Sequence, residues 1–271
     1  MTRATIAILF VAVPACAAIA GIPDGRHLAE ADGGAADGAL DVFDARVDAG
    51  EGSADARSGW CATVSPAPLF CDDFDEGALS AVWHKQLPTS GLVEVDTTAA
   101  ESRPGSLHVK IDDGGTPGGQ TAYATTTFSE TAVRIEVAFA FWPDSLVPDD
   151  PASYVMEIQV GQNTLSLYVN PSKSAWQEHL VPPDATPSFP DHNVLTPLPI
   201  GAWTDADVVV DLGATPAWLT VKYGGTTVRS DPLDPSWTAG PWSLTLGPAY
   251  LNDTTDTRSF HFDDVVVWTH P

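Results

Sequence analysis

Residues 133–141 read VRIEVAFAF, and this stretch is the clearest indication of the fold class. Large apolar residues recur at every second position from Val133 to Phe141, and Arg134 and Glu136 fall between them. Successive side chains of a β-strand point to opposite faces, so this period of two predicts a long strand with one buried face. Further strand-like runs lie at residues 69–74, 92–96, 106–111, 121–128, 156–160, 165–169, 207–212, 219–223, 242–246 and 259–268.

Glycine-rich turns separate these runs. Gly224-Gly225 lies between two of them and is typical of a tight hairpin. One short helix is expected at residues 78–85, with Asp75 as its capping residue. So many short strands in residues 58–271 predict a single all-β domain, a two-sheet antiparallel jelly-roll sandwich. Residues 182–199 hold six prolines and are expected to form a loop, either functional or a plain surface crossover.

Four segments of this domain carry a resemblance through their order and spacing. They are FCDDFD at residues 70–75, SRPGSLHV at 102–109, the run from 201 to 225, and FHFDDVVV at 260–267. Together they resemble the concanavalin A-like lectin/glucanase superfamily, including its laminin G-like members. The resemblance implies one convex and one concave sheet, the concave sheet often holding a glycan.

The run at residues 154–161 resembles the catalytic strand of glycoside hydrolase family 16, which carries three acids two residues apart. Glu157 occupies the nucleophile position, but Gln159 and Gly161 replace the other two acids. A retaining glycosidase needs its two carboxyl groups about 5–5.5 Å apart. We therefore expect no retaining hydrolysis by this route and favour a carbohydrate-binding, lectin-like module without catalysis.

Glycans stack on aromatic rings and form hydrogen bonds with amide, carboxyl and guanidinium groups. The residues predicted to bind a glycan are Arg134, Glu157, Gln159, Tyr168, Trp176 and His179. Polysaccharide lyases on similar jelly rolls transfer protons with Tyr and His, so Tyr168 and His179 are candidates for that role. The alternative is that Tyr168 is a half-buried aromatic residue of the sheet and His179 a surface residue without a catalytic role. Two other functions stay open: a polysaccharide-degrading hydrolase or lyase, and a surface adhesion or scaffold domain that binds protein.

All nine tryptophans lie between residues 60 and 268, and most of them are expected in the core. Trp83, Trp203, Trp218 and Trp268 lie in strand-like segments and are assigned to structure. Trp237 and Trp242 flank proline-containing turns and are candidates for surface exposure, with core packing as the alternative.

Two acid pairs, Asp72-Asp73 and Asp263-Asp264, lie in the first and last predicted strands, which the resemblance brings together. Clustered carboxylates repel one another unless hydrogen bonds or a cation compensate. Calcium takes six to eight oxygen ligands. We predict a structural calcium ion near Asp73 and Asp263; acids that cap turns or face solvent are the alternative.

The N-terminus has the pattern of an export signal. Arg3 precedes an apolar run at residues 6–13, which is far shorter than the roughly 20 residues of a membrane-spanning helix. Residues 13–16, VPAC, resemble the bacterial lipobox, which implies lipid modification of Cys16. An ordinary secretory signal is the alternative. We predict a signal peptide at residues 1–16 and an extracytoplasmic protein of the bacterial cell envelope, either an outer-membrane lipoprotein or a secreted one.

Residues 17–57 are rich in Ala and Gly and hold nine acidic residues. This composition buries too little apolar surface to fold, so it predicts a disordered acidic linker. Cys61 and Cys71 follow shortly after it, and export makes a disulfide between them the favoured pairing over metal binding. Cys16 then stands alone among the three cysteines.

The chain carries a net charge of −24. Such a surface repels phosphate backbones and acidic polysaccharides, so nucleic acid is not an expected partner. We expect a monomer whose partner is a neutral glycan or polysaccharide. It would contact the membrane only through its lipid anchor and need no cofactor besides calcium.

Overall fold

The computed structural model describes residues 59–87, 91–112, 121–145, 153–170, 172–181, 186–194, 196–250 and 257–270. The predictions for the signal peptide, Cys16 and the acidic linker lie outside these residues and stay predictions. Within the described residues, no helix has the length and apolar character needed to cross a membrane.

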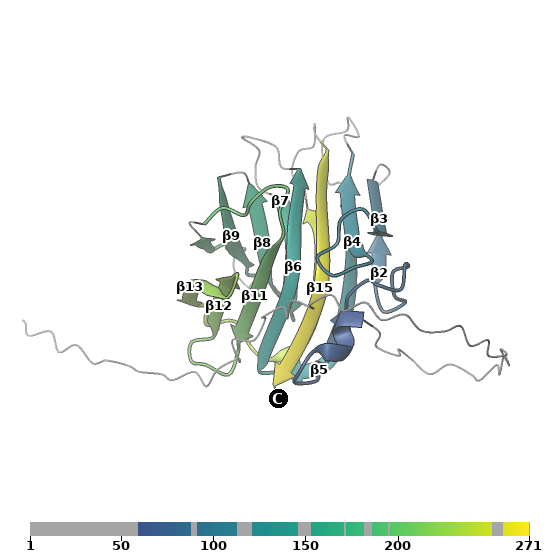
Figure 1. Cartoon of the computed structure of the whole chain (residues 1–271). Helices are drawn as coiled ribbons and strands as arrows, with labels where there is room; N and C mark the ends of the chain where they lie inside the picture. Colours follow the sequence, from purple (N-terminus) through teal and green to yellow (C-terminus); the bar gives the residue numbers. More distant parts are fainter. Residues whose placement is uncertain are drawn as a thin grey trace, which may run out of the picture. The chain divides into compact units, whose positions relative to one another are not determined.

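Eight strands form the first sheet, termed sheet A. The strand order is β13-β12-β11-β6-β15-β4-β3, and β1 pairs with β15 beside this path. The strands are β1 Phe70–Asp72, β3 Gly91–Asp96, β4 Ser106–Ile111, β6 Arg134–Ser145, β11 Thr204–Asp211, β12 Trp218–Tyr223, β13 Thr226–Pro232 and β15 Arg258–His270. Figure 1 shows β11, β6, β15 and β4 side by side in the front layer.

Seven strands form the second sheet, termed sheet B, in the order β10-β9-β8-β7-β14-β5-β2. They are β2 His84–Gln86, β5 Tyr123–Ala132, β7 Ser153–Val160, β8 Asn163–Asn170, β9 Lys173–His179, β10 Asp191–Val194 and β14 Gly240–Tyr250. All strand pairs of both sheets are antiparallel. The predicted all-β, two-sheet antiparallel jelly-roll sandwich is therefore confirmed.

The core lies between the two sheets and follows the period of two seen in the sequence. Ile135, Val137, Phe139 and Phe141 of β6 are at most 1% exposed. Facing side chains come from sheet B, among them Met156, Ile158, Leu165, Leu167 and Leu244. Burial of this apolar surface, at about 25 cal/mol per Å², is the main force that holds the sheets together.

The helix predicted at residues 78–85 is wrong. Those residues form turns followed by β2, whose three residues pair with β5. Trp83 explains the outcome: it is 4% exposed and packs edge-on against Phe70. This tertiary contact outweighs a weak local helix preference. The only helical element in the described residues is the 3₁₀ turn η1, Gly59–Thr63.

Strands β9 and β10 were not among the runs expected from the sequence, whereas the hairpin predicted at Gly224-Gly225 is confirmed, because it joins β12 to β13. The proline-rich segment at residues 182–199 contains β10, which pairs with β9, so its described part is not wholly a loop. Trp237 and Trp242 are 4% and 3% exposed, so of the two alternatives the structure places them in the core and not at the surface. Trp218, expected to be structural, is 38% exposed.

The disulfide prediction is confirmed, because Cys61 in η1 is bonded to Cys71 in β1. The two Cα atoms lie 5.9 Å apart. The bond ties η1 to β1, which pairs with β15 in sheet A.

Candidate functional site

Polar and aromatic side chains gather on the outer face of sheet B, at the end formed by β7, β8, β9 and β10. Because strand residues alternate between faces, those next to inward-facing core residues point outward. The group, termed the sheet B patch, consists of Tyr154, Glu157, Gln159, Tyr168, Lys173, Gln177, His179, Asp191 and Asn193. Glu157, Gln159, Tyr168 and His179 of this group were predicted from the sequence.

Gln177 links three strands within the sheet B patch. Its side-chain oxygen accepts a hydrogen bond from the Tyr154 hydroxyl at 2.5 Å. Its side-chain nitrogen donates to a carboxylate oxygen of Asp191 at 2.7 Å. Tyr154 is half-buried and Asp191 is exposed. The amide is thus held in one orientation, with its polar edge between an aromatic ring and a carboxylate.

Lys173 forms a second link, between β8 and β10. Its ammonium donates to the Tyr168 hydroxyl at 3.0 Å and to the side-chain oxygen of Asn193 at 3.3 Å. The hydrogen bond to Tyr168 raises the pKa of Lys173, which stays a cation at neutral pH. Tyr168 itself is only 6% exposed, so a ligand would meet mainly Lys173 and Asn193 here.

Two aromatic rings flank His179. Its ring centroid lies 5.7 Å from that of Tyr154 and 4.5 Å from that of Phe189. Phe189 is 53% exposed, and it comes from the proline-rich segment. Burial lowers the pKa of His179, so the imidazole is neutral at pH 7. An exposed aromatic ring beside hydrogen-bonding groups is an arrangement on which sugars can stack.

Glu157 lies further along the patch on β7. Its cross-strand neighbours are Ser166 and Thr245, neither of which is an acid. The Ser166 hydroxyl donates to its carboxylate at 3.2 Å. Burial raises the pKa of Glu157, and this hydrogen bond partly opposes the rise. These cross-strand neighbours thus supply no second carboxyl for a retaining pair.

Two predicted glycan-binding residues lie elsewhere. Trp176 is fully buried in the core, because it points to the opposite face of β9 from Gln177 and His179. Arg134 lies on β6 in sheet A, where it pairs with Glu136 at 3.2 Å. The prediction that these two residues line the same face as Glu157 is therefore corrected.

Six residues in or beside the patch were not predicted from the sequence: Tyr154, Lys173, Gln177, Asp191, Asn193 and Phe189. Strand β9 carries polar residues on its inner face as well as its outer face, since Ser174 and Glu178 are both buried. This removed the apolar alternation that marks a strand. Gln177 follows Trp176 directly, so a correct strand assignment would have placed Gln177 outward.

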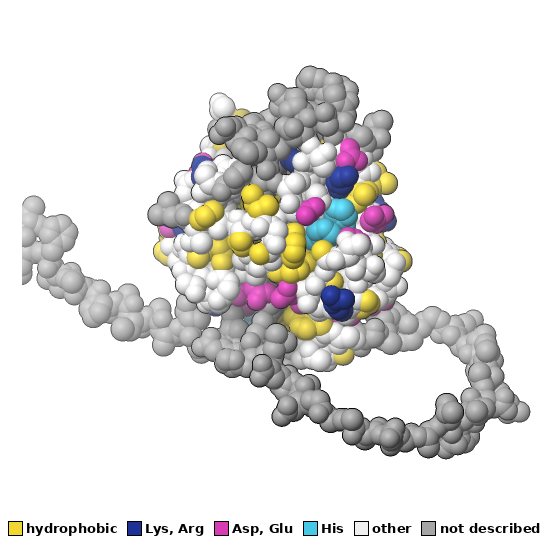
Figure 2. Space-filling model, turned by 45° about the horizontal axis from the view of Figure 1, so that its top comes forward, with side chains coloured by type: hydrophobic (Ala, Val, Ile, Leu, Met, Phe, Trp, Pro, Cys, Tyr) yellow, Lys and Arg dark blue, Asp and Glu magenta, His cyan; other side chains and the backbone are white. Residues whose placement is uncertain are grey.

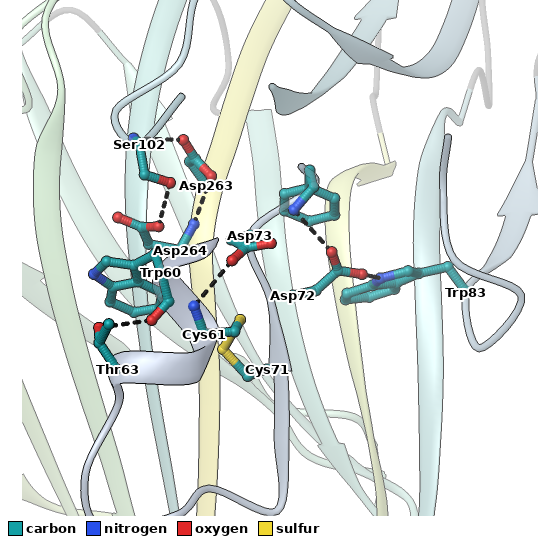
Figure 3. The surroundings of a disulfide bond; sticks show 11 residues. Trp60, Cys61, Thr63, Cys71, Asp72, Asp73, Trp83, Ser102, Asp263 and Asp264 are labelled. Atoms are coloured by element: carbon teal, nitrogen blue, oxygen red, sulfur yellow. Dashed lines mark hydrogen bonds between the residues drawn. A yellow bond between two sulfur atoms is a disulfide. The ribbon is translucent and has the colours of Figure 1, made fainter. Parts of the chain in front are cut away.

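Buried acids form a separate group near the disulfide (Figure 3). Asp72 accepts hydrogen bonds from the Trp83 indole nitrogen at 2.6 Å and the Phe74 backbone at 2.9 Å. Burial raises the pKa of Asp72 to about 6. Oxygens of Asp72, Asp73 and Glu76 lie within 4.8 Å of one another, close enough for one cation.

Asp263 is fully buried and holds the loop before β4. Its carboxylate accepts from the backbone nitrogens of Glu101 at 2.9 Å, Ser102 at 3.0 Å and Asp264 at 2.8 Å. Burial, followed by the charge of Asp264, raises its pKa to about 8 despite these bonds. Asp263 is not a member of the group that Asp73 forms with its neighbours.

A cavity lies at the opposite end of sheet B, against β1, β2 and β5. It is lined by Leu69, Phe70, Val82, His84, Thr126, Thr127, Phe128, Ser129 and Glu130. Its walls are largely apolar side chains and hydroxyl groups, unlike the charged and amide groups of the sheet B patch.

Several solved structures are similar to this chain. The sequence matches no protein-family model and no curated protein. An endo-β-1,4-glucuronan lyase from the fungus Trichoderma reesei superposes with a TM-score of 0.62 at 12% identity, covering 75% of this chain and 96% of the lyase.

Two further structures share the same architecture. The cellulose-induced protein Cip1 has a TM-score of 0.55 at 15% identity, covering 74% of this chain and 97% of Cip1. Alginate lyase A1-II′ of polysaccharide lyase family 7 has a TM-score of 0.52 at 13% identity, covering 73% of this chain and 97% of the lyase. The fold is thus that of the concanavalin A-like jelly rolls, as the sequence resemblance implied.

Proposed function

We propose that this concanavalin A-like jelly roll is a carbohydrate-binding module whose sheet B patch holds a neutral glycan or polysaccharide. One observation carries the proposal: an exposed aromatic ring, Phe189, stands beside hydrogen-bonding side chains that are already fixed in place. Gln177 is held by its bonds to Tyr154 and Asp191. Groups fixed before binding lose little conformational entropy when a ligand arrives, which favours affinity.

The test is calorimetric titration of the full chain with a panel of neutral and acidic oligosaccharides. We expect binding to at least one neutral glycan. Phe189→Ala and Gln177→Ala should each weaken it about five- to tenfold, since stacking and a fixed hydrogen bond contribute about 1–1.5 kcal/mol each. Trp218→Ala is the matched control, because Trp218 is also an exposed aromatic residue but lies on sheet A.

Two results would count against the proposal. The first is a panel without any binding. The second is equal weakening by Trp218→Ala and Phe189→Ala, which would indicate loose contact of exposed rings rather than a site on sheet B.

A second candidate function is β-elimination of a uronate polysaccharide, favoured by the ring of Tyr154, whose centroid lies 5.7 Å from that of His179 and 6.0 Å from that of Tyr168. In such a step a base, His179 or a tyrosine, removes the proton next to the sugar carboxylate. The electron pair forms a ring double bond, the bond to the leaving oxygen breaks, and that oxygen takes a proton from an acid. The two superposed lyases act on glucuronan and alginate, and they share only the fold with this protein.

The unsaturated product absorbs in the ultraviolet, so incubation with glucuronan and alginate tests the second candidate directly. Elimination should be lost in Tyr154→Phe and in His179→Gln and retained in Trp218→Ala. Absence of new absorbance with both substrates, while a neutral glycan binds, would leave binding alone as the function.

We also retain a structural calcium ion near Asp73 and Asp263 as a proposal. Its support is the group of Asp72, Asp73 and Glu76 at the end of β1, whose mutual repulsion a cation would relieve, and Asp263 is a buried acid outside this group. Thermal melting should occur at a higher temperature in calcium than in chelator. Magnesium at the same ionic strength is the control, and equal melting temperatures in calcium and chelator would remove the proposal.

Export and lipid attachment at Cys16 are proposed on the sequence pattern alone. Metabolic labelling with palmitate in a bacterial host should mark the full chain and leave Cys16→Ala unlabelled. Equal labelling of both chains, or export without any label, would contradict lipid attachment at this cysteine.

A further inference from the structure

Two histidines face each other on the outer face of sheet A. His108 of β4 and His261 of β15 are direct cross-strand partners. Their rings are stacked, with centroids 4.2 Å apart and planes 7° from parallel. Figure 2 shows histidine side chains at the surface of this face, with acidic and basic side chains around them.

Asp96 completes a group of three possible ligands. It is the last residue of β3, the strand next to β4, and its backbone pairs with Ser106. One ligand atom from each of Asp96, His108 and His261 lies within 4.8 Å of the others. Thr98 orients the Asp96 carboxylate through its backbone nitrogen at 3.0 Å and its hydroxyl.

The Ser106 hydroxyl determines which ring nitrogen of His261 carries the proton. The Ser106 hydroxyl donates to the backbone oxygen of Ala99 at 2.5 Å. Its oxygen therefore accepts from Nδ1 of His261, 3.1 Å away. This arrangement leaves the lone pair on Nε2 of His261. Metal-bound histidines commonly donate their second ring nitrogen to an oxygen in this way.

His108 has a comparable partner, since its Nε2 lies 2.8 Å from the Ser259 hydroxyl. Trp203 packs edge-on near His261, with centroids 6.4 Å apart, and gives the group an apolar wall.

We propose that Asp96, His108 and His261 form a binding site for a divalent transition-metal ion, with zinc as the probe. Two imidazoles and one carboxylate suit zinc and copper, whereas calcium prefers oxygen ligands alone. Three protein ligands leave a coordination position for water. The site is separate from both the sheet B patch and the acids near the disulfide, and it does not depend on the proposed glycan binding.

Metal binding requires a small rearrangement. Each lone pair lies in the plane of its own ring, so two parallel rings cannot both point at one ion. In tetrahedral zinc sites the ligand atoms lie about 3.3 Å apart, given bond lengths of about 2.0–2.1 Å. His108 is the more exposed ring, so we expect it to turn toward Asp96 while His261 stays in place. The bound ion would then join β3, β4 and β15.

The experiment uses the full chain after treatment with chelator. Zinc titration by calorimetry should show one ion per chain, and zinc should raise the melting temperature by mass action. Copper bound in its place should show nitrogen coupling from two imidazoles in its electron paramagnetic resonance spectrum. His108→Gln and Asp96→Asn should each weaken zinc binding about tenfold or more.

The matched control is His84→Gln, since His84 is an exposed histidine on β2 of sheet B. This variant should bind zinc as the unchanged chain does. Asp96→Asn keeps the size of the side chain, so it remains informative if His108→Gln does not fold. Unchanged zinc affinity in Asp96→Asn, or a copper spectrum without nitrogen coupling, would overturn the proposal.

Discussion

Glu178 is a buried carboxylate in β9, only 1% exposed, and its partners surround both of its oxygens. One oxygen contacts Nε2 of His192 at 2.8 Å. The other accepts from the Trp237 indole nitrogen at 2.6 Å and the Asp234 backbone nitrogen at 3.0 Å. A buried charge is tolerated when each of its oxygens has such partners.

Trp237→Phe removes one donor from this carboxylate and keeps an aromatic ring. We expect the free energy of unfolding to fall by about 2 kcal/mol, the range for a hydrogen bond to a charged group. Urea unfolding followed by circular dichroism measures the loss. Trp218→Phe is the control, because its indole bonds to Ser230 at the surface, and it should cost less than about 0.5 kcal/mol. Equal losses of unfolding free energy in Trp237→Phe and Trp218→Phe would show that the buried hydrogen bond stabilises the protein no more than the exposed one.

Among the elements, β14 depends on Gly247. This residue has a φ of 108°. A Cβ atom there would lie 2.5 Å from the backbone oxygen of Ala122 and 2.7 Å from a methyl of Val109. The register of β14 with β7 shifts just beyond Leu246, so the close approach coincides with an irregularity in the ladder. Only glycine fits both the backbone angle and the space.

Gly247→Ala should therefore lower the free energy of unfolding by more than backbone strain alone would, because the added methyl group also overlaps neighbouring atoms. Gly77→Ala is the control, since Gly77 has a φ of 72° and a Cβ atom added to it would meet nothing within 4 Å. The control should cost about 1–2 kcal/mol from backbone strain, and Gly247→Ala about 1–3 kcal/mol more from overpacking. Similar unfolding free energies for the two variants, measured in urea, would contradict this account.

His192 joins elements of the two sheets. It lies on β10 of sheet B, between Glu178 of β9 and Asp231 of β13 in sheet A, with Nδ1 3.1 Å from the Asp231 carboxylate. Burial alone lowers the pKa of His192, but the hydrogen bonds and charges of the two acids together raise it above its ordinary value. The imidazolium is therefore favoured in the folded state.

The stability that His192 contributes should be fully present below its unfolded-state pKa and lost as the pH rises through the folded-state pKa. The difference in unfolding free energy between the unchanged chain and His192→Gln should thus be constant below about pH 6.5 and shrink above it. His179→Gln is the control, and its pH trend should be the opposite. Burial lowers the pKa of His179, so protonation of this residue at low pH disfavours the folded state. Parallel pH trends for the two variants would refute the assignment.

At the scale of the whole molecule, the chain carries a net charge of −24 at pH 7. Like charges repel within the folded state, and salt screens them, with a Debye length of about 30 Å at 0.01 M and about 3 Å at 1 M. Sodium chloride should therefore raise the melting temperature by a few degrees at pH 7. Near the sequence pI of about 4.2 the net charge vanishes, and the salt effect should shrink with it. The same salt effect at both pH values would contradict self-repulsion as the cause.

The alternation of apolar residues made the sandwich predictable, since strand period and core position are local properties of the chain. Strand β4, Ser106–Ile111, has the same bounds in the sequence and in the structure. Strand β9 was missed because its inner face holds the polar residues Ser174 and Glu178. Their burial depends on partners distant in sequence, such as Trp237, which no local pattern reveals.

Periodicity was enough to predict the fold class and the core of β6, and the export signal together with the short spacing of Cys61 and Cys71 predicted their pairing. The grouping of polar residues on one face followed instead from strand pairing, which no local pattern encodes. Trp176 and Gln177 are neighbours in sequence but lie on opposite faces of β9, one in the core and one in the sheet B patch. The same pairing brings His108 opposite His261, two residues far apart in the sequence, because β4 and β15 are adjacent only in the folded sheet.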